Sequence, residues 1–247
     1  MQQIFPESQV SIDVHAVYNA DVREPVGDRP WVLANMISSA DGGISVDGTS
    51  GGLGGDGDKA VFNALRSVPD IVMVASGTVI AENYKPPTLP DEVQTERVAR
   101  GQHALPRLAI VTRSLSIEPT QEVFDGDTRP LIVTTANSDE VARNELSNVA
   151  DIITAGDDDV DLDDALKQLA ADGAKCVLLE GGPTLNGAFV DADLIDELCL
   201  SVAPFLLGGE SPRIIDHSSE GKLRDLRLDR TLHDDDGALF QRYVRNR

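Results

Sequence analysis

The sequence predicts an α/β fold in which helices flank a mixed and mostly parallel sheet. From Trp31 to the segment that begins at Pro183, short apolar runs alternate with helix-like segments, as in parallel strands joined by helices. From Glu197 onward, three strand-like runs follow one another without a helix, which favours antiparallel pairing. We therefore expect a parallel sheet with antiparallel strands on its C-terminal side.

Length and hydropathy limit the class of protein. The 247 residues suit one α/β domain, which we place at residues 29–247 after an extended N-terminal arm over residues 1–28. No apolar run is long enough to cross a bilayer, so no membrane partner is expected. The N-terminus has neither the basic nor the apolar region of a secretion signal, and we expect a cytoplasmic protein.

Charge limits the partners. The net charge of −21 repels nucleic acid, and it also opposes phosphorylated ligands unless local Arg, Lys or backbone N–H groups bind them. The two cysteines, Cys176 and Cys199, lie in apolar runs and are expected to be buried thiols. No metal is expected, because the histidines do not have the spacing of metal ligands: His15, His103, His217 and His233.

In chain order, the first predicted strand covers residues 31–37 and ends in the polar break 38–42. At this end Asn35 and Ser38 or Ser39 either meet a ligand or precede an Asx turn. The glycine-rich stretch 42–57 is either a loop that closes on a ligand or a plain surface loop.

A helix follows at residues 59–66, with Asp56 or Asp58 as its cap. Its last residue, Arg66, either complements the helix dipole or binds an anionic group. A buried strand at 70–75 then leads into a helical start, where Thr78 either donates to a ligand or caps the helix. We expect a proline-rich connection over residues 83–90, and a loop with a helical turn in the polar segment that continues through Arg100.

The next strand, 107–112, is followed at once by Arg113 and Ser114. A guanidinium beside hydroxyls suits a 2′-phosphate, although an exposed, solvated arginine explains the pattern equally simply. The acidic run 157–159 is interpreted as a solvated loop and helix cap. The remaining elements are strands at 131–135, 152–153, 197–203, 223–228 and 238–244, and helices at 138–146 and 162–171.

The stretch 176–188 combines a buried strand, the glycine pair Gly181-Gly182 and a helix that begins at Pro183. Free N–H groups and the helix dipole suit a phosphate here, and Glu180 stands at the carboxyl end of the strand, where α/β sheets bind ligands. A Gly-Gly-Pro turn also occurs as a plain connection between a strand and a helix, so this motif alone leaves both possibilities open.

Four motifs together resemble the reductase domain of the bifunctional riboflavin-biosynthesis deaminase/reductases and its stand-alone relatives. They are Ser38-Ser-Ala-Asp-Gly42, Gly77-Thr-Val-Ile-Ala-Glu82, Leu179-Glu-Gly-Gly-Pro-Thr184 and Ala203-Pro-Phe-Leu-Leu-Gly-Gly209. The resemblance implies a dihydrofolate-reductase-like three-layer fold, a homodimer and NADPH as cofactor. It also implies hydride transfer to the ribose C1′ of a ribosylaminopyrimidine 5′-phosphate, giving the ribitylamino form.

The resemblance further implies roles for individual residues. The carboxyls of Glu180 or Glu82, acting through water, are candidate proton donors, and Asp41 would fix a loop near the substrate. Glu180, Ser50 and Arg66 match positions that hold the substrate phosphate, with Asn35 on the substrate side. The cofactor would be held by Thr78, Gly181, Gly182, Pro183, Thr184 and Leu185, and its 2′-phosphate by Thr112, Arg113 and Ser114.

Some positions depart from the family pattern. The zinc deaminase motif is absent, Glu82-Asn83 replaces Asp-Asp or Asp-Pro, Gly52 replaces Trp, and Asn35 replaces Lys. These changes lie on the substrate side, so two alternatives stay open. One is NADPH-dependent reduction of a pterin-like or dihydrofolate-like heterocycle, and the other is a non-catalytic nucleotide-binding module. Glu180 is expected to face the substrate, and pairing with a distant arginine would contradict that role.

Overall fold

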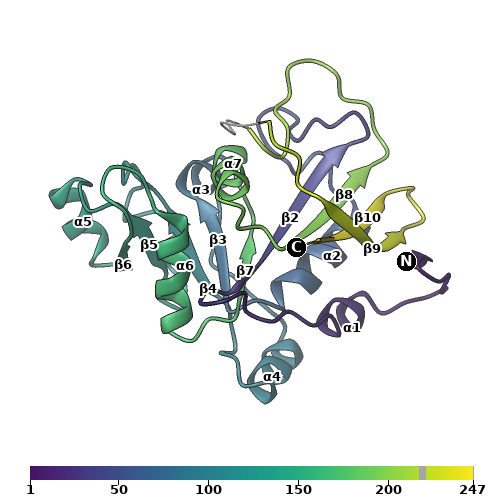
Figure 1. Cartoon of the computed structure of the whole chain (residues 1–247), viewed down its shortest axis with the longest axis horizontal. Coiled ribbons are helices and arrows are strands. Elements are labelled where there is room, and N and C mark those ends of the chain that lie inside the picture. The colour runs from purple at the N-terminus through teal and green to yellow at the C-terminus, as the bar shows by residue number, and fades with distance from the viewer. Residues whose placement is uncertain (217–220, 247) are drawn as a thin grey trace.

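The computed structural model of the chain describes residues 1–216 and 221–246, so His217 lies outside the described residues. Its centre is a ten-stranded sheet with helices on both faces (Figure 1). In order across the sheet, the strands are β1 (Gln2–Phe5), β9 (Leu226–His233), β10 (Leu239–Arg245), β8 (Glu197–Ala203), β2 (Trp31–Ser39), β7 (Cys176–Leu179), β3 (Ile71–Ala75), β4 (Arg107–Val111), β5 (Leu131–Thr134) and β6 (Asp151–Thr154).

The pairing confirms the predicted mixed sheet. Every neighbouring pair from β8 to β6 is parallel, whereas β8–β10, β10–β9 and β9–β1 are antiparallel. The last two strands are joined by a hairpin rather than a crossover helix, and the hairpin allows this reversal. The strand predicted at 223–228 instead runs from Leu226 to His233, because its pairing with β10 reaches from Leu226 to the hairpin turn.

Two hydrophobic clusters make the fold a three-layer structure. Leu178 of β7 packs in one cluster with residues of α1 and α2, whereas Val177 and Leu179 pack in the other with residues of α6 and α7. Alternate side chains of a buried strand point to opposite faces, so one strand contributes to both layers. The helices are α1 (Val14–Asn19), α2 (Asp56–Arg66), α3 (Ser76–Ala81), α4 (Asp91–Ala99), η1 (Glu122–Phe124), α5 (Glu140–Leu146), α6 (Leu162–Ala171) and α7 (Pro183–Asp191).

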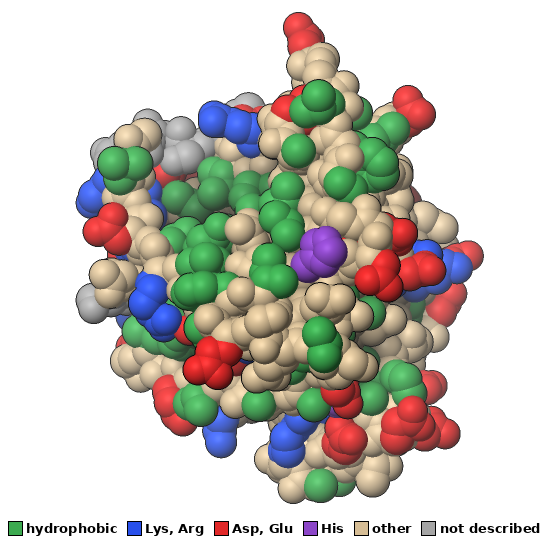
Figure 2. Space-filling model, turned by 90° about the vertical axis from the view of Figure 1, so that its right-hand side faces the viewer, with side chains coloured by type: hydrophobic (Ala, Val, Ile, Leu, Met, Phe, Trp, Pro, Cys, Tyr) green, Lys and Arg blue, Asp and Glu red, His purple; other side chains and the backbone are tan. Residues whose placement is uncertain are grey.

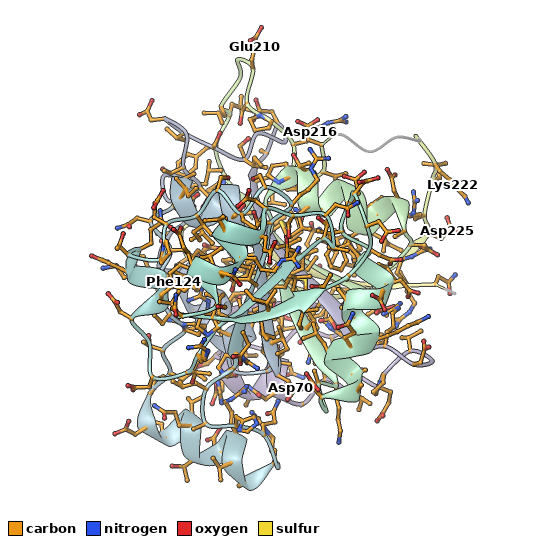
Figure 3. All side chains as sticks on the ribbon, turned by 90° about the vertical axis from the view of Figure 1, so that its left-hand side faces the viewer. Asp70, Phe124, Glu210, Asp216, Lys222 and Asp225 are labelled. Atoms are coloured by element: carbon orange, nitrogen blue, oxygen red, sulfur yellow. The ribbon has the colours of Figure 1, made fainter. Side chains whose placement is uncertain are left out.

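The two ends of the parallel strands differ in what lies there. Asp70 stands at the amino end of β3, where its Oδ2 accepts hydrogen bonds from the N–H groups of Lys175 (2.8 Å) and Cys176 (3.0 Å). The loop that carries Glu210 rises at the opposite end of the molecule (Figure 3). The loops that can form a site therefore lie at the carboxyl ends of the strands, away from Asp70.

The N-terminal arm is more ordered than its sequence predicts. β1 pairs with β9, and α1 packs against α2, so residues 1–28 are not simply extended. Arg23 binds Glu197 at 2.8 Å, which holds the arm to the start of β8, and Arg29, directly after the arm, binds the adjacent Asp196 at 2.6 Å. These partners lie far along the chain, and no local pattern reveals them.

Two local expectations are wrong, and one of two open alternatives is removed. The segment after Asn83 contains the helix α4, which is anchored by the buried Arg97, rather than a single helical turn. Gly55 caps α2, and Asp56 and Asp58 lie in its first turn, so neither is the cap. Ala75 caps α3, which removes the N-cap role considered for Thr78.

Both cysteines are buried free thiols, as expected. In the part of the chain that is described, every helix is too short or too polar to cross a membrane.

Candidate active site

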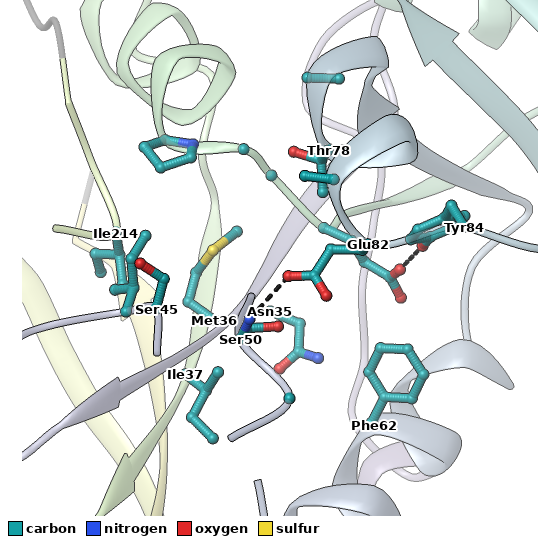
Figure 4. Close-up of a pocket in the computed structure, with 18 of the residues that line it drawn as sticks. Asn35, Met36, Ile37, Ser45, Ser50, Phe62, Thr78, Glu82, Tyr84 and Ile214 are labelled. Carbon is teal, nitrogen blue, oxygen red and sulfur yellow. Dashed lines mark hydrogen bonds between the residues drawn. The ribbon is translucent and has the colours of Figure 1, made fainter. Parts of the chain in front are cut away.

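A cavity of about 900 Å³ opens at the carboxyl ends of β3 and β7, beside β2 (Figure 4). Its walls come from β2, the glycine-rich loop, α2, α3, the turn before α7 and the segment near Ile214. This is the edge at which parallel sheets of α/β proteins bind ligands. The predicted site residues that line it are Asn35, Ser50, Arg66, Thr78, Glu82, Glu180, Gly181, Gly182, Pro183, Thr184 and Leu185.

The turn before α7 lies against the hydroxyl of Thr78. Gly181 has a φ of +88°, and a Cβ placed on Gly182 would lie 2.6 Å from Thr78 Oγ1. Gly182 is also the N-cap of α7 and has no side chain to bind the first N–H groups of that helix. The turn thus needs glycine at both positions, and it leaves backbone donors at the cavity wall.

Arg66 and Glu180 form a two-pronged ion pair in this wall. Arg66 Nε donates to Glu180 Oε1 at 2.9 Å and Nη2 to Oε2 at 2.8 Å, and the Glu180 side chain is only 5% exposed. The guanidinium lies over the Phe62 ring at 4.1 Å and near the Tyr84 ring at 5.1 Å. The Tyr84 hydroxyl accepts from Arg66 Nη2 at 2.5 Å and donates to Glu180.

Pairing with a distant arginine is the outcome named above as contradicting a substrate-facing Glu180, and the structure shows that pairing. Glu180 lines the cavity as expected, but α2 brings Arg66 to the end of β7 and the carboxylate is bound there. A carboxylate buried to this degree needs a cation, and Arg66 supplies one with ideal fork geometry. Any contact of Glu180 with a substrate must share its oxygens with Arg66 and Tyr84.

Glu82 holds the glycine-rich loop. Its Oε1 accepts a hydrogen bond from the backbone N–H of Ser50 at 2.8 Å, across the cavity mouth from α3 (Figure 4). Ile44, Ser45 and Ser50 of this loop line the cavity. Of the two interpretations of the stretch 42–57, the structure favours a loop that borders a binding cavity.

Asp41 lies outside the cavity lining and fixes a neighbouring loop. Its carboxylate accepts from Ser39 Oγ at 2.5 Å and from the N–H groups of Leu207 (3.0 Å) and Gly208 (2.7 Å). The hydrogen bonds from Ser39 and from these two backbone groups hold the pKa of the Asp41 carboxyl below its usual value. Asp41 therefore joins the loop after β2 to the loop after β8.

The group proposed for the 2′-phosphate lies outside the cavity lining, at the end of β4. Thr112 is buried and its Oγ1 accepts from the N–H of Leu115, whereas the hydroxyl of Ser114 is exposed. Arg113 is 68% exposed and pairs with Asp159 at 2.6 Å. The acidic run 157–159 thus supplies a partner for Arg113. No group of three or more His, Cys, Asp or Glu within residues 1–216 and 221–246 could hold a metal ion.

Sequence reasoning missed several residues of the cavity. Tyr84 follows α3 in a proline-rich connection that gave no functional signal, and Asp58 was considered only as a helix cap. Asn186 is 2% exposed, donates to the Ile214 carbonyl at 2.7 Å, and leaves its Oδ1 without a partner among the described residues. An unpaired buried acceptor beside Gly181 is a stronger sign of a ligand than any pattern in the sequence around it.

Comparison with known proteins gives consistent matches. A family described as the RibD C-terminal domain matches residues 30–240. The 2,5-diamino-6-ribosylamino-4(3H)-pyrimidinone 5′-phosphate reductase of Methanothermobacter thermautotrophicus is 30% identical over 76% of this chain and 83% of its own length. The protein of the same name from Archaeoglobus fulgidus is 27% identical over 77% and 88%. The riboflavin biosynthesis protein RibD of Mycobacterium tuberculosis is 30% identical over 73% of this chain and 44% of its own length.

Solved structures agree with these matches. A pyrimidine reductase-like protein from Corynebacterium diphtheriae superposes with a TM-score of 0.84 and 27% identity, covering 96% of this chain and 100% of that one. A dihydrofolate reductase from Enterococcus faecalis superposes with a TM-score of 0.50 and 12% identity, covering 88% of this chain and 97% of that one. The second likeness supports the dihydrofolate-reductase-like fold and nothing further.

Proposed function

Because the chain belongs to the RibD C-terminal domain family, we propose that it reduces a ribosylaminopyrimidine 5′-phosphate to the ribitylamino form in riboflavin biosynthesis. The names of the archaeal relatives support this substrate class. The observation that carries the proposal is the cavity at the carboxyl ends of the strands. In one wall of this cavity the turn Gly181-Gly182 packs against Thr78. The reaction is a hydride transfer to the ribose C1′.

NADPH is the proposed cofactor, and the cavity residues fit a dinucleotide. A Cβ at Gly182 would fill the space beside Thr78, and the first N–H groups of α7, to which the N-cap Gly182 offers no side chain, suit a pyrophosphate. The unpaired Asn186 Oδ1 suits an amide donor such as that of a nicotinamide ring. When bound, NADPH would supply the hydride. The residues assigned to it are Thr78, Gly181, Gly182, Pro183, Thr184 and Leu185.

The 2′-phosphate role of Arg113 remains a proposal. Thr112, Arg113 and Ser114 follow β4, which lies next to β3 in the sheet, so they stand at the same edge as the cavity. Asp159 neutralises Arg113 in the absence of a ligand, but both side chains are largely exposed. An exposed pair of this kind is worth about 0–1 kcal/mol, so a phosphate can displace Asp159 at little cost.

On the substrate side, the polar groups of Asn35, Ser50 and Arg66 line one part of the cavity. Arg66 uses Nε and Nη2 to bind Glu180 and Tyr84, which leaves Nη1 for a phosphate oxygen. Asp41 acts indirectly, because its carboxylate holds the loop after β8. These residues orient the substrate, since no covalent step is required of the protein.

A second candidate is the reduction of a pterin-like or dihydrofolate-like heterocycle, and one observation favours it. The cations lining the cavity are already paired within the described residues: Arg66 with Glu180, Lys59 with Asp56 and Lys85 with Glu122. The two lysines are also 72% and 66% exposed. A doubly charged phosphate therefore gains less binding free energy here than in a site with a free buried cation. An unphosphorylated ring needs no such cation.

We also propose a homodimer in the cytoplasm. One face of β8 carries the half-buried Leu198, Leu200 and Val202, in strict alternation with buried residues. A second cavity of about 240 Å³ continues this face toward Leu226, which is itself 41% exposed. Hydrophobic side chains gather on the side of the molecule that carries these strands (Figure 2). A second copy of the chain would cover this apolar face.

The test of function compares substrates directly. Purified protein is mixed with NADPH and either the ribosylaminopyrimidine 5′-phosphate or dihydrofolate, and the loss of NADPH absorbance is followed. Faster turnover of the pyrimidine supports the first proposal, and turnover of dihydrofolate alone would replace it with the second. Absence of turnover together with no NADPH-induced rise in thermal midpoint would favour the non-catalytic alternative, since a bound cofactor stabilises the folded state by mass action.

A further inference from the structure

The proposed reduction needs a proton donor, and the two carboxyl groups favoured by sequence are both engaged. Glu180 is held by Arg66 and Tyr84, and Glu82 accepts the N–H of Ser50. We propose that Asp58 is the proton donor, an inference that rests on the proposed function. Asp58 lies in the first turn of α2 and lines the cavity between the glycine-rich loop and Phe62.

The glycine-rich loop lies directly against Asp58. A Cβ placed on Gly54 would be 2.8 Å from Asp58 Oδ2. A Cβ on Gly57 would be 2.1 Å from Asp234 Oδ2 and 2.9 Å from the Phe240 ring. A Cβ at Gly54 in the loop, or at Gly57 in the first turn of α2, would therefore meet one of these two carboxyl groups. The backbone at Gly54 therefore packs against the Asp58 carboxyl.

Asp234 is the charged neighbour of Asp58. It stands in the turn between β9 and β10 and is 8% exposed. Its Oδ1 accepts from the N–H groups of Asp236 at 3.1 Å and Ala238 at 2.9 Å. These two hydrogen bonds hold the Asp234 carboxyl in place near Asp58.

Among the residues that the structure describes, no cation forms an ion pair with Asp58 or Asp234. Within the described ranges Asp58 forms no ion pair, because Lys59 turns to Asp56 and Arg66 is bound to Glu180. Ser201 of β8 offers a hydroxyl, and the remaining charged groups of the cavity wall are Glu82 and Lys85. Burial raises the pKa of the Asp58 carboxyl, the hydrogen bond with Ser201 opposes the rise, and the charge of Asp234 adds to it. Asp58 thus keeps its proton at a higher pH than an ordinary aspartate.

The step balances with this donor. Bound NADPH would supply a hydride to C1′ of the ring-opened imine, and the electron pair of the C=N bond would move to nitrogen. The nitrogen takes the proton of the Asp58 carboxyl and becomes the amine, and the Asp58 carboxylate later recovers a proton from water. A carboxyl group with a raised pKa suits this task better than an ordinary aspartate, because general acids work best with a pKa near the working pH.

The test is Asp58→Asn, which keeps the size and polarity of the side chain but has no acidic proton. In single-turnover experiments, hydride transfer should fall by about 100-fold or more, with NADPH binding unchanged. The wild-type rate should fall as pH rises through the pKa of Asp58, and the D58N rate should lose that dependence. Asp56→Asn is the matched control, because Asp56 is 95% exposed in the same helical turn and does not line the cavity.

A D58N protein with wild-type rate and pH profile would overturn the proposal. A second measurement separates it from the proposed function. Carbon-13 NMR follows the titration of the Asp58 carboxyl, assigned by its absence in D58N, and this needs no substrate. A midpoint above that of ordinary aspartates supports the proposal, and an ordinary midpoint rejects it, whether or not the pyrimidine turns over. Lack of turnover by the wild-type protein counts against the proposed function alone.

Discussion

Gly182 approaches Thr78 so closely that a Cβ on the glycine would lie 2.6 Å from the threonine Oγ1. We predict that Gly182→Ala weakens NADPH binding and lowers the free energy of unfolding by about 1–3 kcal/mol. The reason is that the added methyl group must displace the Thr78 side chain of α3. Calorimetric titration with NADPH measures the affinity, and denaturant unfolding measures the stability. Gly77→Ala is the control, since a Cβ there meets nothing within 4 Å. Equal effects of both variants would show that the contact with Thr78 is unimportant.

Removing one partner of the Arg66–Glu180 pair leaves a charge in a largely buried site. Glu180→Gln should therefore lower the free energy of unfolding by about 3–5 kcal/mol. Arg66→Lys cannot keep both hydrogen bonds to Glu180, and it should raise KM for the phosphorylated substrate more than for its dephosphorylated form. Arg107→Lys, which also keeps the positive charge and lies outside the cavity lining, is the control. Equal changes in KM for the two substrates would remove Arg66 from phosphate binding.

Arg113 provides a test of cofactor choice. We predict that Arg113→Ala weakens NADPH far more than NADH, because only NADPH carries the 2′-phosphate that the guanidinium would bind. Dissociation constants for both cofactors measure the effect. Arg129→Ala removes a similarly paired surface arginine and serves as the control for net charge. Equal losses for NADPH and NADH would rule out the role proposed for Arg113.

Glu197 makes stability depend on pH in the acid range. Burial opposes its ionisation, but Arg23 and Arg242 outweigh burial and lower the pKa of Glu197 to about 2. The folded-state pKa is below the unfolded value of about 4.3, so this stabilisation is present above that value and is lost as pH falls toward 2. Glu197→Gln should cost about 3–5 kcal/mol at neutral pH and less below pH 3. Urea unfolding across this range measures it, with the exposed Glu7→Gln as control. A cost for Glu197→Gln that does not change with pH would contradict this account.

The apolar face of β8 provides a test of assembly. If a second copy covers this face, the wild-type protein has the mass of a dimer, and Leu200→Asp shifts it to a monomer by placing a charge in the interface. Light scattering coupled to gel filtration reports the mass. Val141→Asp on α5 is the control, since Val141 is already 67% exposed. A wild-type monomer would remove the proposed dimer.

The sequence by itself determined the sheet and one side of the cavity. Apolar runs located the central strands, and the change of pattern after Pro183 predicted the antiparallel strands. The turn Gly181-Gly182 was recognisable because glycine is needed where the backbone adopts a positive φ and approaches another side chain. Features of this kind depend on residues that are neighbours in the chain, so a local pattern records them.

Only the tertiary structure decided how the charged groups are paired. Arg66 meets Glu180 across 114 positions, and Arg23 meets Glu197 across 174. The same packing gives Asp58 a carboxylate neighbour, Asp234, from the far end of the chain. Periodicity reports which face of an element is buried, but not which distant element covers it. Whether a carboxylate is bound, free or protonated depends on that distant element, so the chemistry of Glu180 and Asp58 could not be predicted from sequence.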